Sequence, residues 1–311
     1  MFTYAKVKDQ PALLRTMTSL DRSEVEELVE PFRAAWAARV RQTALPAADR
    51  QRQPGGGRKP ALRTIEDKLL FILYYFKCYP LQEVFGAEFG LSQERACEWV
   101  HILGPVLKEA LATLNVLPER DAARLAAKLR ESGETKFGID GVERRIQRPR
   151  DAAEQVEYYS GKKRTHTVKN NVVVTIKSRQ VKYLSQTHKG KKHDKKICDE
   201  AQPTFPPGSS LYQDTGFQGY APADVKTWQP KKKPRGQDLS PQDKRRNQRI
   251  SRVRIVVEHV LAGVKRCRIV KDVLRNTTEG FADLVMEIAC GLHNFRTARR
   301  AQQRAAEPYF R

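Results

Sequence analysis

The feature that most constrains the fold is a run of β-branched residues in the second half of the chain. The stretch HTVKNNVVVTIKSRQVKYLSQTH predicts one strand over His166–Ile176 and a second over Gln180–Thr187. Only a short polar segment separates the two strands, so they are expected to pair antiparallel. This part of the chain therefore predicts an antiparallel meander.

Two further predicted strands each end at an aspartate. The stretch KFGIDGVERRIQRPR predicts a short strand over Phe137–Ile139 that stops at Asp140, with Gly141 allowing a turn into another strand. The stretch SLYQDTGFQGY predicts a strand that ends at Asp214 and is followed by a turn, and HDKKICDEAQ before it is expected to be helical. Side chains at element ends can converge, so the two carboxylates are predicted to lie at one site.

The first half of the chain is predicted to be helical. An amphipathic helix is expected over Asp21–Arg41, and a linker rich in Gly, Pro and Arg follows over Gln51–Thr64. Thr64 and Asp67 have the spacing of a capping box, which favours the start of a further helix at that point.

The stretch LQEVFGAEFGLSQERACEWVHIL has the spacing of a helix-turn-helix. It predicts a helix over Leu81–Phe89, a turn at Gly90 and a second helix from Ser92. In the DNA-binding form of this motif the second helix enters the major groove, which makes Gln93 and Arg95 candidate DNA-contacting residues. Two acidic residues on the same outward face favour an ordinary helical hairpin equally, so both interpretations stay open.

The charge of the chain indicates a polyanionic partner. Lys and Arg number 58 against 36 Asp and Glu, which gives a formal net charge of +22. Each phosphate that such a protein neutralises releases a counterion, and this release favours binding. Aromatic content is only 8%, and no single-stranded RNA recognition pattern is present, so duplex DNA is favoured. A ribosome-associated or merely soluble basic protein is the alternative that charge leaves open.

The chain is expected to stay inside the cell, in the cytoplasm. No apolar run approaches the roughly 20 residues that a membrane-spanning helix needs, and the N-terminus has neither the basic start nor the apolar core of a signal peptide. Five cysteines stand far apart without a CxxC pair, which indicates neither a disulfide framework nor a structural zinc site.

A third carboxylate stands in a basic helix. The stretch RIVVEHVLAGVKR predicts a helix in which Glu258 flanks an apolar stripe of valines. Alone it would be an exposed partner of Arg254 at i,i+4, worth only about 0.3–0.5 kcal/mol. It follows the two aspartates in the order Asp, Asp, Glu, however, and three convergent carboxylates are the ligand set that a pair of Mg²⁺ ions requires.

Together these stretches resemble the DDE transposases of bacterial insertion sequences, in particular the group five insertion sequences and their eukaryotic Harbinger-type relatives. The resemblance rests on FGIDGVERRIQRP, YYSGKKRTHTVKNNVVVT, LYQDTGFQGY, the basic helix and the upstream helical stretch, and covers most of the chain from about residue 58 to 300. It implies an α/β fold with an RNase H-like catalytic domain, in which helices flank a mixed sheet. An all-α helix-turn-helix region precedes this domain. The implied regions are 1–57 (helical region and linker), 58–132 (helix-turn-helix) and 133–305 (catalytic, with a basic insertion at about 215–249).

The resemblance also implies roles for single residues. It assigns a catalytic and metal-binding triad to Asp140, Asp214 and Glu258, with two Mg²⁺ ions as cofactors or Mn²⁺ as a substitute. The family signature Y-x2-R-x3-E-x6-K reads here as Ser251, Arg254, Glu258 and Lys265, so a serine replaces the tyrosine. The family's second acid precedes the TGFQG turn, which leaves Asp194 as a helix-start residue or an accessory contact. Basic and polar residues in two clusters are expected to support catalysis or hold phosphates: Lys162, Lys163, Arg164, His166, Lys231, Lys232, Lys233 and Arg235.

The predicted function is that of an insertion-sequence transposase. Such an enzyme binds the terminal inverted repeats of its element and the target DNA, and catalyses Mg-dependent cleavage and strand transfer. A homodimer or higher oligomer on DNA is expected by analogy. Trp228 is expected either to stack on a displaced base or to anchor its loop. Two other functions stay open: a domesticated endonuclease that cuts without joining, and a catalytically idle DNA-binding relative.

Overall fold

The computed structural model describes residues 1–43, 60–234 and 236–306, and the chain divides into two compact units. Unit 1 comprises Met1–Val116 and Arg266–Ile269, and unit 2 comprises the remaining two segments, from Leu117 and from Val270 onward. Most of the predicted linker, and Arg235, lie outside the described residues. The expected division between residues 132 and 133 differs from the division between the units, because Leu125 and Leu129 are fully buried in the core of unit 2.

Unit 1 is built from helices. They are α1 (Tyr4–Val7), α2 (Pro11–Thr18), α3 (Arg22–Thr43), α4 (Ile65–Cys78), α5 (Gln82–Phe89) and α6 (Gln93–Thr113). The predicted capping box is confirmed, since the Thr64 side chain accepts from the Asp67 N–H and the Asp67 carboxylate accepts from the Thr64 N–H. The helix-turn-helix shape is confirmed as well: Gly90 ends α5 with a φ of 70°, and the Ser92 side chain caps α6.

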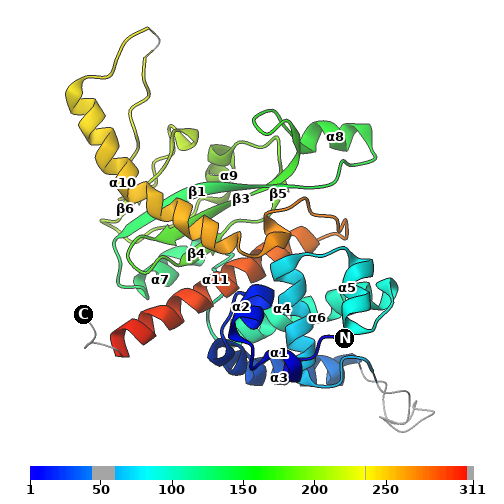
Figure 1. The fold of residues 1–311 in the computed structure, drawn as a ribbon. Helices are drawn as coiled ribbons and strands as arrows, with labels where there is room; N and C mark the ends of the chain where they lie inside the picture. The colour runs from blue at the N-terminus through cyan, green and yellow to red at the C-terminus, as the bar shows by residue number, and fades with distance from the viewer. Residues whose placement is uncertain (44–59, 235, 307–311) are drawn as a thin grey trace. The chain divides into compact units, whose positions relative to one another are not determined.

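Unit 2 is an α/β unit with a mixed sheet, as predicted (Figure 1). Its strands are β1 (Lys136–Arg145), β2 (Tyr159–Ser160), β3 (Thr165–Thr175), β4 (Val181–Leu184), β5 (His188–Lys189), β6 (Ser210–Tyr212) and β7 (Lys226–Trp228). Their order is β2-β3-β1-β6-β7, and β4 and β5 also pair with β3. The meander of β1, β3 and β4 is antiparallel, which confirms that prediction, whereas β6 pairs parallel with β1 and β7 parallel with β6.

The prediction of a turn after Asp140 is wrong. β1 runs without a break through Asp140 and Gly141, and it pairs with β3 from Phe137 to Arg145. The glycine serves close packing instead of a turn. A Cβ at Gly141 would lie 2.6 Å from the carboxyl carbon of Asp194, the first residue of α9 (Asp194–Ala201), so only glycine leaves room for that carboxylate.

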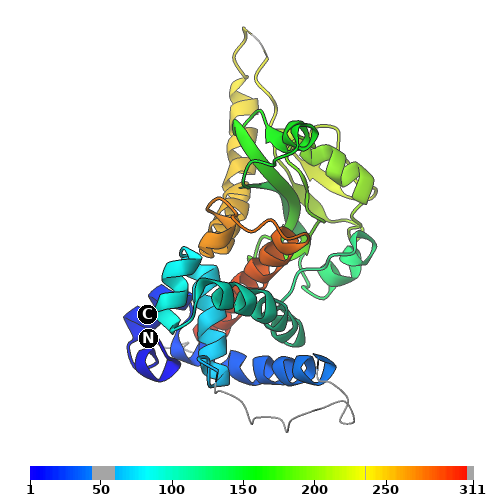
Figure 2. The same cartoon turned by 90° about the vertical axis from the view of Figure 1, so that its right-hand side faces the viewer.

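Helices cover both faces of the sheet in unit 2. The apolar core on one face includes Phe137 and Ile139 of β1, Leu129 of α7 (Leu125–Arg130) and Cys198 of α9. The other face carries α10 (Pro241–Val264), and Figure 2 shows α10 in yellow and α9 in lime on opposite sides of the sheet. The helices α8 (Ala152–Tyr158) and α11 (Phe281–Ala306) complete the unit.

Two contacts hold the helices α11 and α10 against strands of the sheet. The Asn294 side chain of α11 bonds both the N–H and the C=O of Val181 in β4. A Cβ at Gly138 of β1 would lie 2.3 Å from Cγ2 of Val257, so α10 packs directly on the strand backbone. Gly138 therefore sets how closely α10 approaches β1.

The segment 215–249, expected as a basic insertion in the form of a long loop, is partly regular. It contains a 3-10 helix at Thr215–Phe217, the strand β7 and the first turns of α10. Ser240 caps α10 by accepting from the Asp243 N–H, and the Asn247 side chain bonds the backbone of Lys231 at both N–H and C=O. The basic residues of this segment thus lie partly on the first turns of α10 and partly on the loop before it.

We predict that Gly138→Ala destabilises the protein by about 1–3 kcal/mol, because the new methyl group overlaps Val257 and α10 must move. Adding Val257→Ala removes the overlapping methyl groups, so the double variant loses less than the sum of the two single changes. Urea unfolding of the three variants measures this coupling. Gly161→Ala is the matched control, since no atom lies within 4 Å of its added Cβ. Strictly additive effects would show that this contact does not set the helix position.

Candidate active site

Strand register places two aspartates side by side. Gly138 of β1 pairs with Tyr212 of β6 in the parallel ladder. Asp140 and Asp214 each stand two residues beyond this pair, and neighbouring strands lie about 4.8 Å apart. β6 ends at this level, and Asp214 caps the following 3-10 helix by accepting from the Gly216 N–H at 2.7 Å. The predicted convergence of the two acids is therefore supported by the register, although only Asp214 follows a strand end.

The environment of Asp140 disfavours its negative charge. The pKa of its carboxyl is raised to about 6, mainly by burial and then by the negative charges of Asp214 and Asp194. The Gly141 N–H, which donates to Asp140 Oδ1 at 2.8 Å, and the guanidinium of Arg254 act in the opposite direction. The Asp140 carboxyl is thus partly removed from water and is repelled by the negative charge of Asp214.

Asp194 is a third acid near this pair. It begins α9, which confirms that it is a helix-start residue, and its carboxylate packs against Gly141. Burial raises the pKa of Asp194, and the nearby ammonium of Lys169, 3.7 Å from Oδ1, lowers it. Its Oδ1 accepts no hydrogen bond from any described residue. Local sequence patterns do not indicate this approach, because it depends on Gly141 lacking a side chain.

Glu258 stands apart from the aspartates. It follows Val257, the residue that packs on Gly138, and lies one helical turn after Arg254. Its side chain is exposed, and no ion pair joins it to Arg254 in the part of the chain that the structure describes. The Arg254 charge acts instead on Asp140. Over the described ranges, no three His, Cys, Asp or Glu side chains are close enough together to hold a metal ion.

The donor chemistry nevertheless fits a divalent cation. Asp140 and Asp214 offer carboxylate oxygens, which hard cations such as Mg²⁺ prefer, and their mutual repulsion would be relieved by positive charge. A third carboxylate on α10 lies one residue from the contact between that helix and β1. The fit is thus good for two ligands, and the exposed Glu258 side chain does not join them in this structure.

The cluster of basic residues before β3 lies partly at this site. Lys162, Lys163 and Arg164 are exposed in the turn between β2 and β3, and the Lys162 charge acts on Asp194. His166 is half-buried and its ring contacts Tyr159, with centroids 5.8 Å apart. Lys162 thus acts electrostatically on an acid near the site, whereas His166 packs against Tyr159.

The basic residues of the second cluster are exposed and partly paired. Lys231 Nζ lies 2.7 Å from Asp243 and Lys233 Nζ lies 2.7 Å from Asp238, while Lys232 is exposed. Exposed pairs of this kind are weak, so phosphates can replace the carboxylates. Arg235 lies outside the described residues.

Other predicted residues lie further along the helices. Lys265 is the half-buried C-cap of α10, and Ser251 is exposed on the same helix. In unit 1, Gln93 and Arg95 are exposed on α6, and Arg95 forms an exposed ion pair with Glu98 at 2.7 Å. Their outward position agrees with the predicted helix-turn-helix face.

Comparisons with known proteins agree with this architecture. The model of the DDE superfamily endonuclease family matches residues 139–294, and the model of the helix-turn-helix of DDE superfamily endonucleases matches residues 60–113. The chain therefore belongs to the DDE superfamily endonucleases, and its α/β unit is of the nuclease type. It is 28% identical over 254 residues to a protein of Microchaete diplosiphon described as "Probable transposase for insertion sequence element IS702", covering 82% of this chain and 88% of that protein. No solved structure matches. None of the helices described is long and apolar enough to cross a membrane.

We predict that Asp140→Asn stabilises the metal-free protein above about pH 6. The Asp140 carboxyl has a pKa of about 6 in the folded protein, above its ordinary value of 3.8. The folded state therefore holds this proton more tightly than the unfolded state does. This contribution to stability is complete below pH 3.8 and is lost as the pH rises through 6. The charged Asp140 therefore costs on the order of 2–3 kcal/mol at neutral pH, and asparagine removes this cost. Urea unfolding in a chelator should show the gain at neutral pH and its disappearance near pH 4. Asp224→Asn, at an exposed position, is the control. Equal stability of wild type and variant at neutral pH would contradict the electrostatic description of the site.

Proposed function

We propose that the chain is the transposase of a bacterial insertion sequence and acts on DNA in the cytoplasm. The observation that carries the proposal is the register of β1 and β6, which sets two carboxylates beside each other, one with a pKa raised to about 6. Membership of the DDE superfamily endonucleases and the description of the relative from Microchaete diplosiphon support it. The net charge of +22 supports a DNA partner.

The metal-dependent step is proposed to use three carboxylates. Asp140 and Asp214 would hold divalent ions, Mg²⁺ or in its place Mn²⁺, and Glu258 would turn from its exposed position to complete the set. No described residue holds the Glu258 side chain by an ion pair, so this rotation breaks no such interaction. A pair of bound ions would activate the attacking oxygen and stabilise the leaving oxygen of an in-line displacement. Arg254, whose charge already reaches Asp140, would balance the negative charge that the phosphate brings.

Two displacements would complete the reaction. Water attacks the phosphodiester at the element end, a P–O bond forms and the bond to the 3′ oxygen breaks, which frees a 3′-hydroxyl. That hydroxyl then attacks a phosphodiester of the target DNA, so a new P–O bond joins element to target as one target P–O bond breaks. Both steps need the same in-line geometry, and one carboxylate set can serve both.

The rest of the chain is proposed to bring DNA to this site. The exposed residues Gln93 and Arg95 on α6 would contact the terminal repeats from the helix-turn-helix region, proposed to span residues 58–132. Lys231, Lys232 and Lys233 would hold phosphates without reading sequence. Two or more copies would bring two element ends together.

We predict that Glu258→Gln largely abolishes both cleavage and joining while folding and DNA binding survive, because the variant loses a negative metal ligand. The purified protein is incubated with its own flanking DNA and Mg²⁺, and cut and joined ends are mapped. Asp140→Asn and Asp214→Asn should give the same loss, and a double variant should be little worse than a single one, since the three act as a unit.

The control for this experiment is Glu279→Gln, which changes another exposed glutamate of unit 2. Near-normal cleavage by folded Glu258→Gln protein would remove Glu258 from the site, and Asp194 would then be the carboxylate to test. Cut ends without joined ends in the wild-type protein would indicate an endonuclease that does not transpose.

A further inference from the structure

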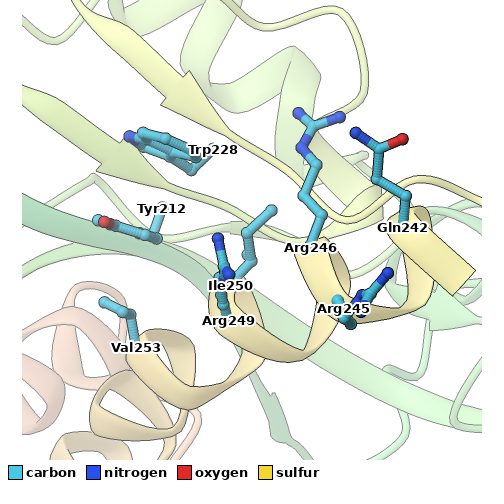
Figure 3. A pocket seen from close by; sticks show the side chains of 8 residues that line it. All are labelled: Tyr212, Trp228, Gln242, Arg245, Arg246, Arg249, Ile250 and Val253. Atoms are coloured by element: carbon cyan, nitrogen blue, oxygen red, sulfur yellow. The ribbon is translucent and has the colours of Figure 1, made fainter.

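A pocket at the end of β6 has no role in the proposed reaction. It lies between the strands β6 and β7 and the start of α10, and its volume is about 590 Å³ (Figure 3). One wall consists of Tyr212 and Trp228, whose rings are nearly parallel, at 10°, with centroids 6.0 Å apart. The two residues pair in the parallel ladder, so strand register holds both rings on the same side of the sheet.

The opposite wall is cationic. Arg245, Arg246 and Arg249 of α10 line the pocket, and all three are exposed. Within the described residues, none of them forms a hydrogen bond or ion pair with a carboxylate, in contrast to Lys231 and Lys233 of the neighbouring loop. The three arginines therefore make this side of the pocket positively charged, and the charge of Arg246 also acts on the Asp243 carboxylate.

The pocket adjoins the proposed active site through the backbone. Tyr212 precedes Asp214 by two residues, and the N–H of the intervening Gln213 donates to the Trp228 C=O at 3.0 Å. The Gln229 side chain, next to Trp228, donates to the Asp214 C=O. A ligand that contacts Tyr212 would thus lie two residues along the chain from Asp214, the carboxylate proposed to act on the phosphodiester.

We propose that this pocket binds an unpaired nucleotide of the DNA strand that lies at the active site, with its base against Trp228 and its flanking phosphates on the arginines. The inference rests on the proposed function. An aromatic face accepts any base by stacking, and guanidinium groups bind phosphate in a bidentate manner. Gln242, which also lines the pocket, adds an amide that can pair with a base edge.

A nucleotide within a strand fits better than a free nucleotide. Arg245 and Arg249 stand one helical turn apart on α10, so they can hold successive phosphates of one strand. An acidic peptide would use the arginines but would leave the paired aromatic wall without a planar partner. The combination of both walls therefore favours a base with phosphates on either side.

Binding assays in a chelator test the proposal without requiring catalysis. Three duplexes of the same arbitrary sequence are compared: one fully paired, one with a single unpaired adenosine bulge, and one with an abasic residue in that bulge. Wild-type protein should prefer the adenosine bulge over both other duplexes by about tenfold, the usual effect of one stacked base. Free AMP should not displace the bulged duplex.

Variants then assign the preference to the pocket. Trp228→Ala should abolish the preference for the adenosine bulge and leave affinity for the paired duplex within about twofold, whereas Trp228→Phe, which keeps an aromatic face, should retain most of it. Changing Arg245 and Arg246 to Gln should weaken binding of all three duplexes and reduce the slope of log affinity against log salt by about 0.9 for each lost phosphate contact. Arg252→Gln, an exposed arginine of α10 that does not line the pocket, should leave the preference for the bulge unchanged.

The outcomes separate this inference from the proposed function. Salt-dependent binding with equal affinity for the three wild-type complexes would overturn the nucleotide pocket and leave a DNA-binding enzyme. A preference that persists in folded Trp228→Ala protein would also overturn it, as would displacement of the bulged duplex by AMP. Failure to bind any of the duplexes would contradict the proposed function itself, and the inference would fall with it.

Discussion

The parallel pairing of β1 with β6 is the interaction on which the site depends. It fixes Gly138 opposite Tyr212 and so sets Asp140 beside Asp214, two residues further along each strand. Placing two carboxylates together in a partly buried position is unfavourable in the absence of a cation, and the pKa of Asp140, raised to about 6, is the sign of that cost. Residues that reduce stability in this way are typical of functional sites, where the strain is part of the mechanism.

Two glycines make the surroundings of Asp140 possible. Gly138 admits Val257 of α10 on one face of β1, and Gly141 admits the Asp194 carboxylate on the other. Asp140 lies between these glycines and is partly buried, and the charges of Arg254 on α10 and Asp194 on α9 act on it. Glu258, the residue proposed to supply a third carboxylate, follows Val257 on the same helix. The position of α10 thus decides whether the third proposed carboxylate can join the other two.

Much of this arrangement could be predicted from local sequence patterns. The capping box at Thr64, the glycine turn at Gly90 and the β-branched run of β3 depend on short-range preferences, and each forms as expected. The turn after Asp140 was expected because a glycine following an acid commonly ends a strand. β1 continues there because its long antiparallel ladder with β3 outweighs that local preference.

The remaining features depend on contacts between distant segments. Asp194 approaches Gly141 and Val257 approaches Gly138 because the glycines have no side chains. A sequence pattern shows the glycines but does not show which distant residue packs against each of them. The pocket at Tyr212 and Trp228 forms because β6 and β7 pair in parallel register and α10 begins at Pro241, inside the segment expected to be a basic insertion. Trp228 therefore belongs to a strand, where it forms part of a pocket wall, and not to a free loop.

The most direct test of the central claim is a crystal structure of the protein grown with Mn²⁺, in which anomalous scattering locates the metal. The proposed site predicts Mn²⁺ bound by oxygens of Asp140 and Asp214, with the Glu258 side chain rotated from solvent to become a third ligand. Metal bound elsewhere, or bound by Asp140 and Asp214 with Asp194 as the third ligand while Glu258 stays in solvent, would contradict it.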